Sequence, residues 1–153
     1  MNTGISDKNA AKVADLLNKL VADEFILLTK TYNYHWNIHS LSFKEMHLLY
    51  EEQYNQLHKI IDDVAERVPQ IGHKAKATLK EFLAMTRLKE GPDHEDQSKQ
   101  VKQILSDHEN VIRSIRKDID TCDDCKDAVT ADLLTKILGQ HEKMAWMLRS
   151  YTK

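Results

Sequence analysis

The chain has 153 residues, of which only four are glycine and two are proline. That length suffices for one buried core, and no strand-like alternation is present, so we predict a single all-α domain over 1–153 with a short tail at 1–6. The net charge of −2 excludes a general attraction to nucleic acid or anionic membranes. Without an apolar run of about 18 residues or a signal peptide, and with only two cysteines, a cytoplasmic protein is expected.

Apolar residues recur at helical spacing in four long segments of the chain. These helices are expected at residues 7–37, 43–68, 95–120 and 128–151. Ser42 and Glu45 have the spacing of a capping box at the start of the second helix. Pro69 is expected to end that helix at Val68, because a residue before proline disfavours the helical conformation.

The connection between the second and third long helices has a short helix of its own. Thr78 and Glu81 form another capping-box pattern, and this helix is expected to run through Met85 before Gly91 and Pro92 break it. An acidic turn is expected at 120–127. Four long helices with one long crossover between the second and third are typical of the ferritin-like variant of the four-helix bundle.

The second helix carries four potential metal ligands on one face. At about 100° per residue, Glu51, Asp62 and Glu66 fall within roughly 100° of His47, beside the apolar core face. A solvated surface is the ordinary explanation of such a stripe, and a metal site is the alternative. His47 and Glu66 are roughly 30 Å apart along the helix, so one chain cannot bring both to one metal. Two antiparallel copies, related by a dyad near Leu57, would place the first pair of ligands opposite the second.

His35 is a further candidate ligand on the first helix. It precedes His47 by twelve residues, and the short link at 37–41 lets it reach back over the start of the second helix. The within-subunit signature of di-iron bundles, Glu-x-x-His, is missing, because no glutamate stands three residues before any of the eight histidines. The residues therefore favour a site shared between two subunits.

Several motifs resemble the Dps family, the ferritin-like mini-shells named as DNA-binding proteins from starved cells. The matching segments are Tyr34-His35-Trp36-Asn37, Phe43 with Met46-His47, Glu51, the run at 62–67 and the run at 142–149. The resemblance covers nearly the whole chain and implies an intersubunit ferroxidase site. His35, His47 and Glu51 would come from one chain, and Asp62 and Glu66 from its dimer mate. Glu51 stands where many members have aspartate, which lengthens that ligand by one methylene.

The resemblance also implies a reaction and an assembly. It implies a homododecamer that oxidises Fe(II) with hydrogen peroxide or dioxygen at di-iron sites, stores ferric mineral in its hollow and protects against oxidative stress. Trp36 is expected either to take up oxidising equivalents beside the iron or simply to pack at a helix end. Asp127 and Asp132 match the family's pattern for an acidic pore through which iron enters, with helix capping as the competing role of Asp127.

A DNA-binding nucleoid protein is the rival function. Members that bind DNA commonly use a basic terminal extension, since neutralised phosphates supply the affinity. Residues 1–12 hold only Lys8 and Lys12 against Asp7, and Lys153 alone ends the chain. Direct DNA binding is therefore not expected from the termini, and only a surface patch could support it. An inert bundle without metal would require the match of all five ligands to be accidental.

Two further features have simpler explanations. Cys122 and Cys125 have the spacing of half a zinc knuckle, but no second pair exists, and a surface dithiol is expected. His58 lies within the ligand stripe near the expected dyad, where interface packing is the preferred explanation.

Overall fold

The computed structural model describes residues 3–91, 93 and 96–152. Apart from an isolated bridge between His39 and Asp96, these residues contain no β-structure. The helices are α1 (Asp7–Asn37), α2 (Phe43–Gln70), α3 (Leu79–Met85), α4 (Gln97–Asp124) and α5 (Ala128–Arg149). The predicted all-α ferritin-like bundle, with an extra helix in the crossover, is confirmed.

Some expectations concern residues outside the described part of the chain. These residues are Met1 and Asn2 of the tail, Pro92, Glu95 and Lys153. Among the helices that are described, none combines the length and the apolar character that a membrane span requires.

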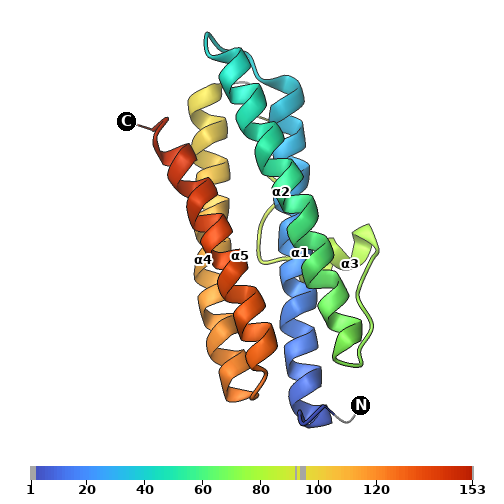
Figure 1. The fold of residues 1–153 in the computed structure, drawn as a ribbon. Coiled ribbons are helices and arrows are strands. Elements are labelled where there is room, and N and C mark those ends of the chain that lie inside the picture. The colour runs from blue at the N-terminus through green and yellow to red at the C-terminus, as the bar shows by residue number, and fades with distance from the viewer. Residues whose placement is uncertain (1–2, 92, 94–95, 153) are drawn as a thin grey trace.

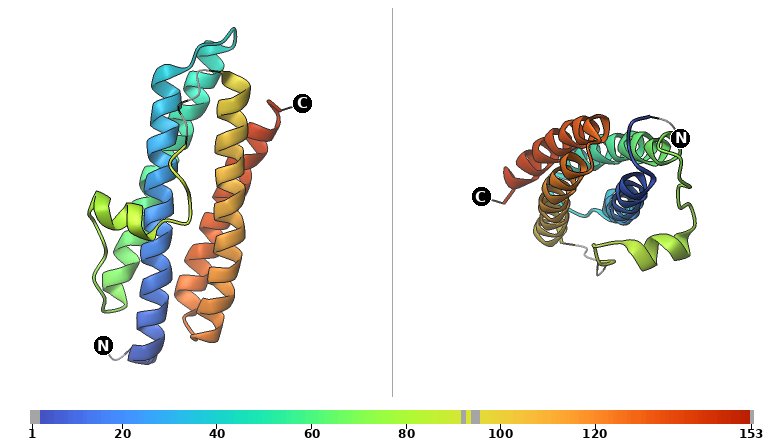
Figure 2. Two further views of the ribbon diagram at one scale, coloured as in Figure 1. Left: turned by 180° about the vertical axis from the view of Figure 1, so that it is seen from behind. Right: turned by 90° about the horizontal axis from the view of Figure 1, so that it is seen from below.

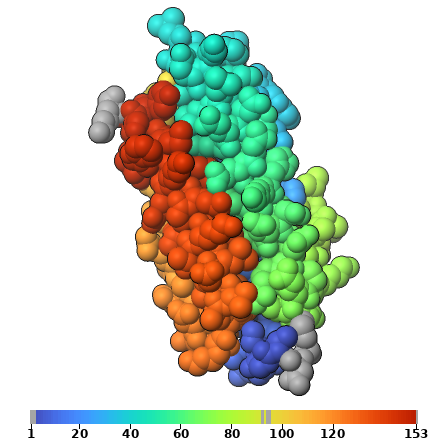
Figure 3. Space-filling model, in the orientation of Figure 1, coloured from blue at the N-terminus to red at the C-terminus, as the bar shows by residue number. Residues whose placement is uncertain are grey.

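The bundle consists of two helical hairpins joined by the crossover (Figure 1). α1 and α2 pack antiparallel, as do α4 and α5, and the crossover makes α2 and α4 run in the same direction. Viewed along the bundle, the four long helices surround a common axis and α3 lies outside them (Figure 2). Phe82 of α3 stacks on Phe25 of α1 with ring centroids 4.3 Å apart, which fastens the short helix to the bundle. Side chains of α2 and α5 meet along one face of the molecule (Figure 3).

Side-chain caps fix several helix ends, and the capping box predicted at Thr78 is confirmed. Ser6 accepts a hydrogen bond from the backbone N–H of Asn9 and begins α1. Thr78 and Glu81 form the full capping box of α3, with each side chain accepting from the other residue's backbone N–H. Such a cap satisfies N–H groups that have no partner within the helix.

Two expected boundaries and one expected cap were wrong. Ser42 precedes α2, but its ψ of 33° is not extended and its side chain makes no capping bond. Pro69 does not stop α2 at Val68, because a proline in the last turn removes only one N–H, and the helix continues to Gln70. The acidic turn expected from residue 120 is helical as far as Asp124.

Helix α5 is also two residues shorter than expected, since it ends at Arg149. Its capping residue, Ser150, closes the helix through hydrogen bonds from its backbone N–H to carbonyls of the last turn. On the core face of α2, Met46, Tyr50 and Leu57 are buried, whereas Phe43 is half exposed.

Charged side chains form ion pairs where the two hairpins meet, and all of them except Arg87 are buried. Lys30 of α1 pairs with Asp107 of α4 at 2.7 Å. Arg87, in the crossover, pairs with Asp23 of α1 at 2.6 Å and with Asp118 of α4 at 2.9 Å. Because breaking a buried ion pair leaves an uncompensated charge, these pairs fix how one hairpin sits on the other.

A second polar cluster lies at the centre of the bundle. Glu24 of α1, His108 of α4 and His141 of α5 are fully buried. Nε2 of His141 lies 2.9 Å from a carboxylate oxygen of Glu24, and its Nδ1 lies 2.9 Å from Nδ1 of His108. Burial, reinforced by His141, holds the pKa of His108 well below its usual value.

Candidate metal centre

Two of the predicted ligands meet at the end of the α1–α2 hairpin. The rings of His35, in the last turn of α1, and His47, in the second turn of α2, stack with centroids 3.7 Å apart. The link between the helices turns the chain back, as expected, so that His35 reaches over the start of α2. His35 is buried and His47 is partly exposed.

The backbone selects the tautomer of both histidines. Nδ1 of His35 lies 2.9 Å from the carbonyl oxygen of His47, and Nδ1 of His47 lies 3.0 Å from the carbonyl oxygen of His35. A carbonyl oxygen can only accept, so each neutral ring holds its proton on Nδ1 and leaves the lone pair on Nε2. A fixed Nδ1–H donor with a free Nε2 is the form in which histidine commonly binds a metal.

Glu51 follows His47 by one helical turn and is partly buried. Tyr54 lies against it, and desolvation together with the Glu51 carboxylate raises the pKa of the Tyr54 phenol. The Tyr54 ring also contacts His35 edge-on, with centroids 5.1 Å apart. Glu51 therefore faces the same region as the histidine pair.

Asp62 and Glu66 lie further along α2, on exposed positions, and neither forms an ion pair with a described residue. Since α2 is unbroken from Phe43 to Gln70, the rise of about 1.5 Å per residue separates His47 from Glu66 by about 28 Å. Within the described part of one chain, no group of three or more histidine, cysteine or acidic residues is placed to hold a metal ion. The structure thus brings His35 and His47 together and leaves the two later carboxylates apart.

Aromatic side chains surround the histidine pair. Phe43 stacks on His47 with centroids 5.2 Å apart. Trp36 is 69% exposed and stacks on Tyr32. The Tyr32 hydroxyl forms a hydrogen bond with His58. Tyr32 and Tyr54 are two tyrosines beside the site that were not predicted from the sequence. The spacing of Tyr32, three residues before His35 on one helix, could have indicated its proximity.

The two acidic residues at the start of α5 differ in their surroundings. Asp127 is buried, accepts a hydrogen bond from the backbone N–H of Thr130 and pairs with Arg67 at 2.9 Å, which confirms its capping role. Asp132 is exposed. The pore role of both residues stays a prediction.

The expectation of a surface dithiol was wrong. Cys122 and Cys125 are both buried and unpaired, at 0% and 3% exposure. Because α4 continues beyond residue 120, Cys122 faces the core rather than a loop. Burial, with neighbouring acidic groups, raises the pKa of the Cys122 thiol to about 12.

Comparison with known proteins identifies the class of protein to which this chain belongs. The family model of the ferritin-like domain matches residues 14–153. A low temperature-induced protein of Nostoc sp. PCC 7120 is 39% identical over 99% of this chain and 86% of its own length. The DNA protection during starvation protein 2 of Bacillus anthracis is 36% identical over 92% of this chain and 96% of that protein.

Solved structures agree with this class. A Dps protein from Bacillus brevis has a TM-score of 0.93 and 32% identity over 97% of this chain and all of that one. The Dps protein of Vibrio cholerae O1, described as a ferritin-like diiron-carboxylate protein, has a TM-score of 0.95 and 26% identity over 100% of this chain and 96% of that one. The chain belongs to the Dps family of ferritin-like proteins. Membership supports a general role in iron storage and protection against oxidative stress.

Proposed function

We propose that this protein is a ferroxidase that couples Fe(II) oxidation to the reduction of hydrogen peroxide at sites shared between two subunits. His35, His47 and Glu51 of one chain would bind iron together with Asp62 and Glu66 of the other. The sites would lie in a dodecameric shell that stores the ferric product. The five residues supply imidazole nitrogens and carboxylate oxygens, a mixed set that suits Fe(II) with positions left open for an oxidant.

The observation that carries the proposal is the orientation of the histidine pair. Nδ1 of His35 is held by the carbonyl oxygen of His47, and Nδ1 of His47 by the carbonyl oxygen of His35, each at 3.0 Å or less. The bundle therefore holds two Nε2 lone pairs ready beside a carboxylate before any metal arrives. A histidine pair formed only for packing would not need both tautomers to be fixed in this way.

The chemistry follows from what these groups can do. Peroxide accepts two electrons, so two irons held by one site can supply both in a single encounter. The carboxylates of Glu51, Asp62 and Glu66 balance the positive charge that increases when iron is oxidised. Exposed Asp132 would attract Fe(II) toward a pore, whereas the carboxylate of Asp127 is already committed to Arg67 and to the α5 cap.

The experiment that tests the shared site is complementation between two inactive variants. One variant carries His35→Ala and His47→Ala, and the other carries Asp62→Ala and Glu66→Ala. In a mixed dimer, the geometry gives one site with every ligand and one site that keeps only Glu51. Random co-assembly from dissociated subunits should recover up to about a quarter of wild-type sites, because half of the dimers are mixed and each has one of two sites intact.

The matched control is Asp63→Ala, which removes a neighbouring carboxylate that lies off the ligand stripe. This variant should oxidise iron at the wild-type rate, both alone and when it is co-assembled with wild-type subunits. A site built within one subunit would recover no activity in the mixture. Activity that stays at the level of the separate variants, with mixed dimers confirmed by mass spectrometry, would refute the shared site.

A further inference from the structure

We propose that Tyr32 and His58 form a redox-active pair that supplies one electron to the iron site when peroxide meets a single bound Fe(II). This role rests on the proposed ferroxidase function, in which a site holding one iron lacks the second electron that peroxide requires. Neither residue is among the proposed iron ligands.

The pair joins α1 to α2 through one hydrogen bond. The Tyr32 Oη atom lies 2.5 Å from Nε2 of His58, and the two rings meet edge-on with centroids 5.8 Å apart. In the Nδ1-protonated tautomer of His58, the phenol donates its proton to Nε2. A phenol ordinarily holds its proton up to about pH 10, so it gives up an electron readily only when a base takes the proton at the same moment. A neutral imidazole is the side chain best suited to accept and return a proton near neutral pH.

Aromatic rings connect this pair to His35 by one route, through Tyr54. Tyr32 stacks on Trp36, the chain neighbour of His35, with centroids 5.2 Å apart and planes at 19°. The ring centroid of Tyr32 also lies 4.6 Å from that of Tyr54, and the ring centroid of Tyr54 lies 5.1 Å from that of His35. An electron leaving Tyr32 therefore crosses only closely packed rings to reach the proposed iron site.

The surroundings favour Tyr32, rather than Tyr54, as the residue that carries the radical after the reaction. The Tyr54 phenol faces Glu51, a proposed ligand whose negative charge is taken up when iron binds. Tyr32 instead faces His58, which no proposed iron ligand contacts through a described hydrogen bond or ring contact.

The proposed step balances in atoms and charge. Fe(II) gives one electron and becomes Fe(III), and Tyr32 gives the second electron and becomes a neutral tyrosyl radical. The phenolic proton moves to Nε2 of His58, which becomes imidazolium. Hydrogen peroxide takes both electrons, its O–O bond breaks, and two hydroxide ions leave. No hydroxyl radical is released, because peroxide receives both electrons at the site.

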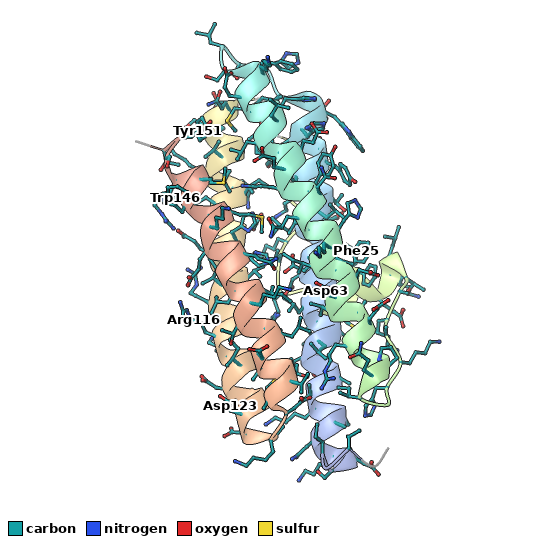
Figure 4. The ribbon with its side chains drawn as sticks, in the orientation of Figure 1. Phe25, Asp63, Arg116, Asp123, Trp146 and Tyr151 are labelled. Atoms are coloured by element: carbon teal, nitrogen blue, oxygen red, sulfur yellow. The ribbon has the colours of Figure 1, made fainter. Side chains whose placement is uncertain are left out.

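The test loads one Fe(II) per proposed site, adds peroxide, freezes the sample and records the electron paramagnetic resonance spectrum. Wild-type protein should give a tyrosyl signal, which ring-deuterated tyrosine narrows. Tyr32→Phe should lose this signal, and His58→Gln, which keeps a polar side chain but removes the base, should give far less of it. Tyr151→Phe is the matched control and should keep the signal, since Tyr151 lies near the C-terminus, beyond α5 (Figure 4).

Iron oxidation is followed in the same samples, which separates the two proposals. Oxidised iron with a tyrosyl signal that survives Tyr32→Phe would overturn the pair and leave the ferroxidase intact. No peroxide-driven oxidation in wild-type protein would overturn the ferroxidase and the role of the pair with it. A second arm uses iron-free protein and a flash-generated ruthenium trisbipyridine oxidant. The radical should again form at Tyr32, and a radical that persists in Tyr32→Phe would count against the pair without any reference to iron.

Discussion

Replacing His108 with glutamine is expected to weaken the acid sensitivity of folding. His108 is fully buried at the centre of the bundle, and burial together with His141 holds its pKa well below the usual value of 6.5. In the unfolded chain the same imidazole is solvated and titrates at its ordinary pKa. Below that pKa the unfolded state therefore binds one more proton at this position than the folded state does.

The size of the effect follows from proton linkage. For one extra proton in the unfolded state, the free energy of unfolding falls by about 1.4 kcal/mol for each pH unit below the unfolded pKa. Between about pH 6.5 and pH 5, His108 should thus remove roughly 2 kcal/mol, a sizeable part of the 5–15 kcal/mol typical of a domain. The stability that comes from keeping this histidine neutral is fully present above its pKa in the unfolded chain and is lost as the pH falls below that pKa.

The assay is urea unfolding across this pH range at one fixed protein concentration, because assembly adds to apparent stability. Glutamine does not titrate and keeps a polar group facing His141. The variant should lose less stability than wild-type protein on acidification, and the difference isolates His108 from the other histidines. His73→Gln, in the loop after α2, serves as the control and should follow the wild-type slope. Equal slopes for wild-type protein and His108→Gln would refute the argument.

Three further outcomes are expected. His47→Ala with Glu51→Ala should leave assembly intact and slow peroxide-driven Fe(II) oxidation at low iron, and an unchanged rate in iron-clean protein would remove these residues from the site. Because residues 1–12 hold only two lysines, micromolar metal-free protein should not retard DNA in a gel at physiological salt, and a salt-sensitive shift would contradict this. Cys122 and Cys125 should resist a thiol reagent in native protein and react after unfolding, whereas fast native labelling would show that they are accessible.

The sequence predicted elements whose signals are local. The bounds of α1 matched because apolar periodicity marks them, and the α3 capping box formed as its spacing indicated. The Ser42 box failed although its spacing is the same, because the tight link from α1 imposes a backbone angle from which the side chain cannot reach. Spacing alone does not report this constraint.

Buried polar groups were the main features that the sequence did not reveal. Asp23 and Glu24 are adjacent acidic residues, a pattern that usually indicates a solvated face. Both are fully buried: Arg87 of the crossover pairs with Asp23, and His141 of α5 reaches Glu24. The proximity of His35 and His47 was predicted, but their tautomers depend on carbonyl positions in a folded link, which no periodicity encodes.

The position of Arg87 restricts how copies of this chain can associate. Each hairpin is a self-contained pair of helices, and the crossover between them is the natural hinge for exchanging hairpins between two chains, as in domain swapping. Opening that hinge would pull Arg87 from Asp23 and Asp118 and leave Asp23 buried without its cation. Breaking such a pair costs about 3–5 kcal/mol, which strongly disfavours the exchanged form. We therefore expect copies of this chain to associate as closed bundles, which would let subunits separate and reassemble without unfolding.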